Sequence, residues 1–155
     1  MARRPDAPLE VALGQRQRVL EEAQQVFSEH ERALQEQARL LAAAQARVQM
    51  VLLQIDAAQR PLPGVPLAVS MIGDLERLLD WCEVQVMVQR ERMDEARAVA
   101  EVARGAVAAA HQNVRALELV LAARAAEREE KARRAELVLA DETAARVHTR
   151  NTVTR

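Results

Sequence analysis

The 155-residue sequence contains almost no aromatic side chains, with one Trp, one Phe and no Tyr. Aromatic residues normally supply much of the buried area of a globular core. Their scarcity argues against an ordinary globule, although 50% of the residues are hydrophobic, because alanine accounts for much of that fraction. A chain rich in Ala, Glu, Arg, Gln, Leu and Val is typical of long helices and coiled coils.

Disulfides, membrane-length apolar runs and excess charge are also lacking. The single cysteine, Cys82, cannot form an internal disulfide, which fits a reducing compartment. No apolar run reaches the roughly eighteen residues needed to cross a bilayer. The start, MARRPDAPLE, has no apolar segment typical of a secretory signal. We therefore expect no direct membrane insertion, and because the net charge is −1, we expect no nucleic-acid partner.

Signatures of catalysis and of cofactor binding are missing as well. The two serines, Ser28 and Ser70, have no His and acid arranged for a triad. The four glycines are scattered, so there is no glycine-rich phosphate loop. The three histidines, His30, His111 and His148, lack the spacing of metal ligands. We therefore expect no enzymatic activity, no catalytic residue, no cofactor and no metal.

Proline is confined to the N-terminus and to one interior segment, PLPGVP, at residues 61–66. Proline cannot continue a helix, and the residue before it is pushed away from helical geometry. Three prolines around Gly64 would end one helix and reverse the chain within a short connection. The sequence therefore predicts a turn at residues 61–66 between two long helices, which makes an antiparallel hairpin.

A strict seven-residue repeat of large apolar side chains runs through the first predicted helix, residues 8–60. A sustained heptad repeat is typical of a left-handed coiled coil. We name these residues the a row, and the residues three positions later, which are mostly small or polar, the d row. We expect the preceding g row to help cover the seam. The a row is Leu13, Leu20, Phe27, Leu34, Leu41, Val48 and Ile55, and the g row is Ala12, Val19, Val26, Ala33 and Leu40.

The second predicted helix, residues 67–148, carries its own a and d rows. Its alanine-rich middle would allow two helices to approach closely. We predict one domain, residues 1–155. The a row is Leu79, Val86, Met93, Ala100, Val107, Val114 and Leu121, and the d row is Leu75, Cys82, Gln89, Ala96, Ala103, Ala110 and Leu117.

The two predicted helices differ in length. Antiparallel pairing from the turn places the start of the first helix opposite about residue 118. Past Leu121 the same register gives charged residues, and the stretch AEREEKARRAE is typical of a solvated helix held by charge pairs. Large apolar residues return at 137–139. The predicted fold is all-α, with two long helices in an antiparallel coiled-coil hairpin and the second helix protruding at its C-terminal end, where we expect a partner.

Three polar features have more than one interpretation. His30 occupies a d position, where it would fix the register of the seam or sense pH. Cys82, also at d, would be a small buried apolar residue or a redox group. Asp141 and Glu142 suggest acid/base chemistry, but adjacent helix positions do not face one another, which favours solvated charges.

Trp81 falls at position c, facing away from the seam. Val84 and Val88 continue that outward stripe, and hairpin pairing places Met50 and Leu53 of the first helix near the same level. An exposed Trp on an apolar stripe suggests a docking surface for a partner. Self-association and packing of a folded-back N-terminus are the alternatives.

The helix–loop–longer helix pattern resembles the FliJ/YscO family, the small stalk proteins of flagellar and injectisome type III export machines. The local resemblance is best at RALELVLAARAAEREEKARRAELVLADETAARVHTR, which is similar to the charged closing helix of the family. That helix ends in an Asp-Glu pair followed by Ala and Arg. Those positions here are Asp141, Glu142, Ala144, Ala145 and Arg146.

The resemblance implies a non-enzymatic central stalk that inserts into a hexameric export ATPase and links it to the membrane export gate. It implies a cytoplasmic protein, peripheral to the inner-membrane export apparatus, with export chaperones as further partners. The patch of Met50, Leu53, Trp81, Val84 and Val88 would then face the export gate. The residues expected to contact the ATPase are Arg134, Leu137, Leu139, Asp141, Glu142 and Arg146.

Two other functions stay open at this point. One is a generic dimeric coiled-coil scaffold, and the other is an export chaperone or escort that holds unfolded cargo. A stalk should be a monomeric hairpin that stimulates an ATPase, a scaffold a stable dimer, and a chaperone a binder of unfolded clients. The resemblance does not separate a flagellar system from an injectisome.

Overall fold

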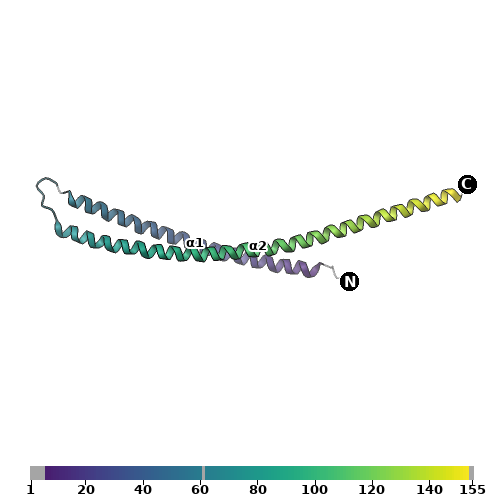
Figure 1. The fold of residues 1–155 in the computed structure, drawn as a ribbon, viewed down its shortest axis with the longest axis horizontal. Coiled ribbons are helices and arrows are strands. Elements are labelled where there is room, and N and C mark those ends of the chain that lie inside the picture. Colours follow the sequence, from purple (N-terminus) through teal and green to yellow (C-terminus); the bar gives the residue numbers. More distant parts are fainter. Residues whose placement is uncertain (1–5, 61, 154–155) are drawn as a thin grey trace. The chain divides into compact units, whose positions relative to one another are not determined.

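The computed structural model describes residues 6–60 and 62–153, with side chains up to Arg146. These residues form two α-helices and no strand, α1 from Ala7 to Gln59 and α2 from Val69 to Val153 (Figure 1). The prediction of an all-α helical hairpin is confirmed. Both ends of α2 differ from the prediction. This helix begins at Val69 rather than at about 67, and it continues to Val153 rather than to about 148. Pro61, the first predicted turn residue, lies outside the described residues.

The start of α1 follows from the residues around Asp6. The backbone carbonyl of Asp6 accepts a hydrogen bond from the N–H of Glu10 at 2.9 Å, so Asp6 is the N-cap residue of α1. Pro8 lies in the first turn, where its missing N–H has no intrahelical partner to lose. α1 then continues without another proline until the connection to α2.

The connection reverses the chain through a type II β-turn. The N–H of Val65 donates to the carbonyl of Leu62 at 3.0 Å. Pro63 occupies the second position of this turn, and Gly64 the third, with φ of 85°. A type II turn favours proline at the second position and needs positive φ at the third, which glycine adopts without a steric penalty. The turn lies inside the predicted segment 61–66.

The contacts of the chain divide it into two units. The loop unit is Glu21–Ala109, which contains the later part of α1, the turn and the first part of α2. The terminal unit combines Met1–Leu20 with Ala110–Arg155. The prediction of a single domain over residues 1–155 stays a prediction.

The core of the loop unit is the predicted heptad seam. Every a and d residue of α2 in this unit is buried or half-buried, and so is every a residue of α1. Leu41, Ala44 and Val86 form its buried cluster, against which Val48 and Met93 pack. In the terminal unit the same rows bury Ala110 and Val114 and half-bury Leu13 and Leu20. The assigned rows are confirmed in the loop unit and, apart from the exposed d-row residue Arg16, in the terminal unit.

The expected contribution of the g row is wrong except at Ala12, which is half-buried. Val19, Val26 and Leu40 expose between 40% and 48% of their surface. The reason is the narrowness of a two-helix seam, which covers positions a and d and leaves the neighbouring positions at its margin. These valines and leucine therefore add apolar surface to the outside of the hairpin.

Candidate partner-binding surfaces

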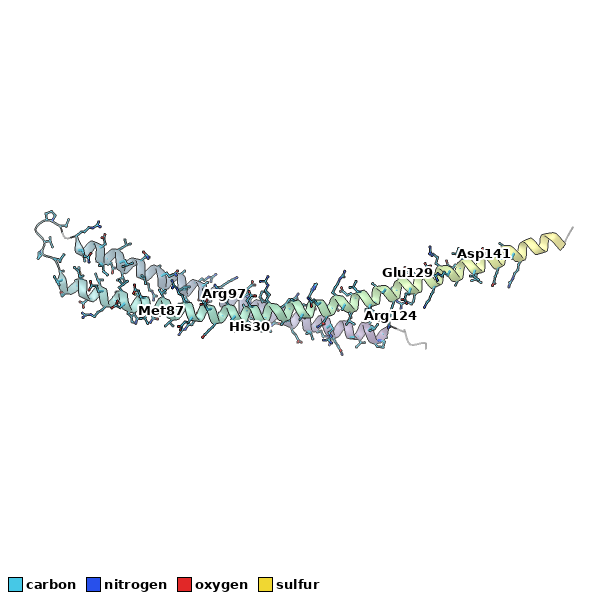
Figure 2. The ribbon with its side chains drawn as sticks, in the orientation of Figure 1. His30, Met87, Arg97, Arg124, Glu129 and Asp141 are labelled. Carbon is cyan, nitrogen blue, oxygen red and sulfur yellow. The ribbon has the colours of Figure 1, made fainter. Side chains whose placement is uncertain are left out.

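The C-terminal part of α2 is exposed at every position from 131 to 146. Figure 2 shows the side chains between Glu129 and Asp141 projecting from α2, with no second helix alongside among the described residues. Leu137 and Leu139 expose 59% and 62% of their surface, and Val138 between them exposes 56%. Three consecutive large apolar side chains therefore face solvent. We name residues 134–146 the C-terminal surface.

The three apolar residues of the C-terminal surface point in different directions. Consecutive residues of an α-helix are rotated by about 100°, so Leu137 and Leu139 lie roughly 160° apart around the helix axis. Val138 lies about 100° from each of them, on the wider side of the helix. A flat partner could cover one of these side chains, but a partner that covers all three has to surround the helix.

The charged residues of the C-terminal surface are of two kinds. Arg134 donates to Glu130 at 2.8 Å, and Arg133 forms a second ion pair with Glu130 at 2.7 Å, so Arg134 is engaged within its own helix. Asp141, Glu142 and Arg146 are exposed, and no ion pair within the described residues involves them. The six predicted ATPase-contact residues share one helix end. Because successive helical residues are rotated by about 100°, the six do not share one face.

The second predicted surface, on the loop unit, is exposed in four of its five residues. Met50, Leu53, Trp81 and Val84 expose between 53% and 69% of their surface. Val88 is half-buried, so its placement on the exposed stripe is corrected. It shares position c with Trp81, which exposes 54% of its surface, so position in the heptad alone does not decide exposure here. We name the four exposed residues the Trp81 patch.

A groove that the sequence did not suggest lies on the loop unit. Its volume is about 530 Å³, and its lining comes from both helices. The residues are at positions a, b and e of the heptad, whereas Trp81 is at c and Val84 at f. We name it the Met87 groove, and it is lined by Gln45, Val48, Gln49, Glu83, Val86, Met87 and Arg90.

Two of the ambiguous residues are placed by the structure. Cys82 is a free cysteine that exposes 4% of its surface, so its interpretation as a small buried seam residue is confirmed. His30 is half-buried at its d position and lines a smaller groove with Val26 and Val102. Neither of its proposed roles, in register or in pH sensing, is tested by this position.

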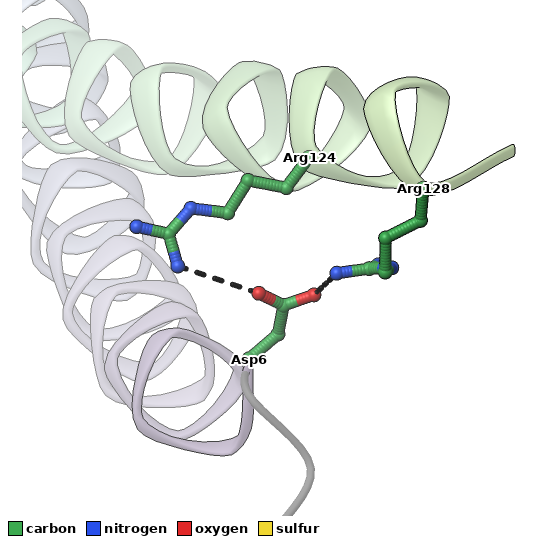
Figure 3. Close-up of polar contacts among 3 residues, drawn as sticks. All are labelled: Asp6, Arg124 and Arg128. Atoms are coloured by element: carbon green, nitrogen blue, oxygen red, sulfur yellow. Dashed lines mark hydrogen bonds and ion pairs between the residues drawn. The ribbon is translucent and has the colours of Figure 1, made fainter. Parts of the chain in front are cut away.

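A contact within the terminal unit corrects the predicted start of the free helix. The carboxylate of Asp6 accepts hydrogen bonds from the guanidinium groups of Arg124, at 3.4 Å, and of Arg128 (Figure 3). The prediction that α2 has no internal partner beyond about residue 118 is therefore wrong. Arg124 and Arg128 continue the d and a rows, so the seam does not stop at Leu121 but changes from apolar packing to ion pairing. We name this contact the Asp6 clamp.

The Asp6 clamp shifts the titration of its carboxylate. The hydrogen bond from Arg128 lowers the pKa of Asp6 below its ordinary value of 3.8, burial opposes this change, and the hydrogen bond from Arg124 lowers the pKa further. Since the folded-state pKa is the lower one, the clamp stabilises the folded protein at pH values above 3.8. That contribution is lost as the pH falls through the folded-state pKa.

We expect Asp6→Asn to lower the melting temperature at neutral pH. Asparagine is as good an N-cap residue as aspartate, so the variant removes the charge while keeping the start of α1. Because protonation removes the same charge from the parent protein, the melting temperatures of the two proteins should converge once the pH falls below the folded-state pKa of Asp6, which lies under 3.8. Glu10→Gln, at an exposed carboxylate without an ion pair in the described chain, is the matched control. Melting curves by circular dichroism across this pH range provide the measurement, and a difference that persists in acid would contradict the ion-pair explanation.

Comparisons with known proteins found no matching family model, no matching curated protein and no matching solved structure. Within the residues that the structure describes, no group of three or more His, Cys, Asp or Glu side chains could hold a metal ion. Neither α1 nor the described part of α2 contains a stretch long and apolar enough to cross a membrane.

Sequence reasoning missed the Asp6 clamp and the Met87 groove for different reasons. A signal for the clamp was present, because Arg124 and Arg128 fall in the d and a rows and Asp6 is an acidic residue at the start of α1. Charge complementarity at those positions could have extended the pairing. The groove has no comparable motif, since its lining residues come from two helices that are distant in the sequence.

Proposed function

We propose that this protein is the non-enzymatic central stalk of a type III protein export apparatus. In this function the C-terminal surface inserts into a hexameric export ATPase, and the Trp81 patch faces a membrane export gate. Export chaperones are further partners, and the protein works on the cytoplasmic side of the inner membrane. The resemblance to the FliJ/YscO family supplies the identity of these partners.

One observation carries the proposal, namely the arrangement of Leu137, Val138 and Leu139 around a helix that no described segment covers. Burial of large apolar side chains is a main source of binding energy at protein interfaces. Covering all three residues requires a partner that encloses the helix, and the central opening of a ring has that shape. Asp141, Glu142 and Arg146, which have no ion pairs in the described chain, supply charges that would orient the helix within such an opening.

Two truncations test the proposal and separate binding from folding. A chain that ends after Lys131 keeps Arg124 and Arg128 but loses the whole C-terminal surface. We expect it to melt almost as the full-length protein does, because residues 132–146 are exposed and contribute little burial. A chain that ends after Ala122 also loses the Asp6 clamp and should melt at a lower temperature at neutral pH.

The functional measurement is ATP turnover by a purified export ATPase from the same organism, with and without each protein. Full-length protein should stimulate turnover, and the chain that ends after Lys131 should not. If that shorter chain stimulates fully while remaining folded, the C-terminal surface is not the ring-binding element and the proposal is wrong.

A further inference from the structure

The Met87 groove leaves apolar surface uncovered beside the seam. Val48 of α1 and Val86 of α2 belong to the packed core of the loop unit, and both also line the groove. Met87 exposes 62% of its surface next to them. The contribution of α1 to the groove is otherwise uncharged, through Gln45 and Gln49. A flexible methionine beside an open apolar groove is suited to filling a similar groove.

The two charged residues of the groove have opposite signs and lie on opposite sides of Met87. Glu83 and Arg90 are both at position e, seven residues apart on one stripe of α2, which separates them by about 10 Å along the helix axis. They are therefore too far apart to pair with each other. Neither has an ion pair with any other described residue.

Three other arginines of α2 differ from Arg90 in having ion pairs, although Arg92, two residues away, has none within the described residues. Arg77 pairs with Asp74, Arg97 with Asp94 at 3.3 Å, and Arg104 with Glu101 at 3.8 Å. Each of these pairs spans three residues of the same helix. In the groove, by contrast, an acidic and a basic side chain are held apart with an apolar residue between them.

We infer that the Met87 groove binds the same groove of a second copy of this chain, with the two α2 helices antiparallel. A two-fold axis beside Met87 brings Glu83 opposite the partner's Arg90 and Arg90 opposite the partner's Glu83. Met87 from each copy then enters the groove of the other. A two-fold interface needs a surface complementary to itself, and a negative–apolar–positive stripe has that property. This charge pattern favours a second copy over an unrelated partner.

The inference uses residues other than those of the proposed function. A dimer of the free protein departs from the monomeric hairpin expected of a stalk, so ATP turnover has to be measured alongside the oligomeric state. The interface uses positions b and e of the loop unit, whereas ring insertion uses the C-terminal surface. The Trp81 patch, at positions c and f, is also a separate set of residues. Loss of the dimer and loss of ATPase stimulation can therefore be measured separately.

The test is an exchange of charges between the two positions, followed by measurement of the oligomeric state by sedimentation equilibrium. Glu83→Arg places two arginines opposite two arginines across the axis, and Arg90→Glu places two glutamates opposite two glutamates. Each variant alone should dimerise about 100-fold more weakly than the parent protein, because like charges are costly at an interface. An equimolar mixture of the two variants should form heterodimers with close to the parent affinity, since every pair across the axis is again of opposite charge.

Glu91→Arg is the matched control, because Glu91 is exposed at position f beside the groove residues without lining the groove. It should leave dimerisation unchanged, and circular dichroism should show that all variants keep their helical content. A monomeric parent protein would overturn the inference. Single variants that dimerise normally would overturn it too, as would a mixture that fails to recover the dimer. ATP turnover measured with the same variants would report on the stalk function, which should be retained whatever the outcome for the dimer.

Discussion

Leu41→Ala should lower the free energy of unfolding by about 2–4 kcal/mol, as large-to-small substitutions in packed cores do. Leu41 exposes 9% of its surface and belongs to the buried cluster with Ala44 and Val86, against which Val48 and Met93 pack. Removing its side chain leaves a cavity that the small neighbour Ala44 cannot fill. Few large side chains are buried in this narrow seam, so one such loss is a large part of its packing.

Denaturant unfolding followed by circular dichroism measures this effect. Gln35→Ala is the control, because Gln35 is an exposed residue of α1 and alanine has a slightly higher helix propensity. The control should be nearly neutral or slightly stabilising. Equal losses at Leu41 and Gln35 would show that the heptad assignment does not identify the packed residues.

The double variant Leu137→Asp with Leu139→Asp should abolish stimulation of the export ATPase without changing the melting of the isolated protein. Both leucines are exposed in the free protein, so carboxylates at these positions remain solvated. In an enclosing partner the same carboxylates would be buried without partners, which costs several kcal/mol or more. The expected result is therefore ATP turnover at the level of the ATPase alone.

Leu119→Asp is the matched control for this double variant, because Leu119 is also an exposed leucine of α2 in the terminal unit, with 55% of its surface accessible. It lies outside the C-terminal surface and should leave stimulation intact. Equal loss of stimulation from Leu119→Asp would mean that any new charge on α2 interferes, and that Leu137 and Leu139 have no special role.

The fold was predictable because its determinants are local and periodic. The a and d rows repeat every seven residues, and proline and glycine mark the turn, so each can be read without knowing what packs against it. Turn chemistry was informative in detail, since Pro63 and Gly64 occupy the two positions that a type II turn demands. The Asp6 clamp was not predicted, because it depends on the exact level at which two distant segments meet.

For the candidate surfaces, the sequence predicted which residues are exposed but not which partner they bind. Heptad position identified Trp81 and Val84 as outward-facing, but it did not separate Val88, which is half-buried at the same position c as Trp81. That Leu137 and Leu139 face opposite sides of the helix follows from helix periodicity alone. The identity of a partner is not contained in the packing of this chain, so it rests on resemblance and on the experiments above.

The type II turn at Leu62–Val65 has a consequence for the order in which the protein folds. Contacts beside the turn close short loops and lose little chain entropy, whereas the clamp between Asp6 and Arg124 joins residues separated by 118 positions. Within the loop unit, pairing can therefore begin next to the turn and extend outward one heptad at a time, with each heptad shortening the next loop to be closed. The Asp6 clamp is then among the last contacts to form and among the first to open. Backbone amides near Asp6 should therefore exchange hydrogen with solvent faster than those beside the turn.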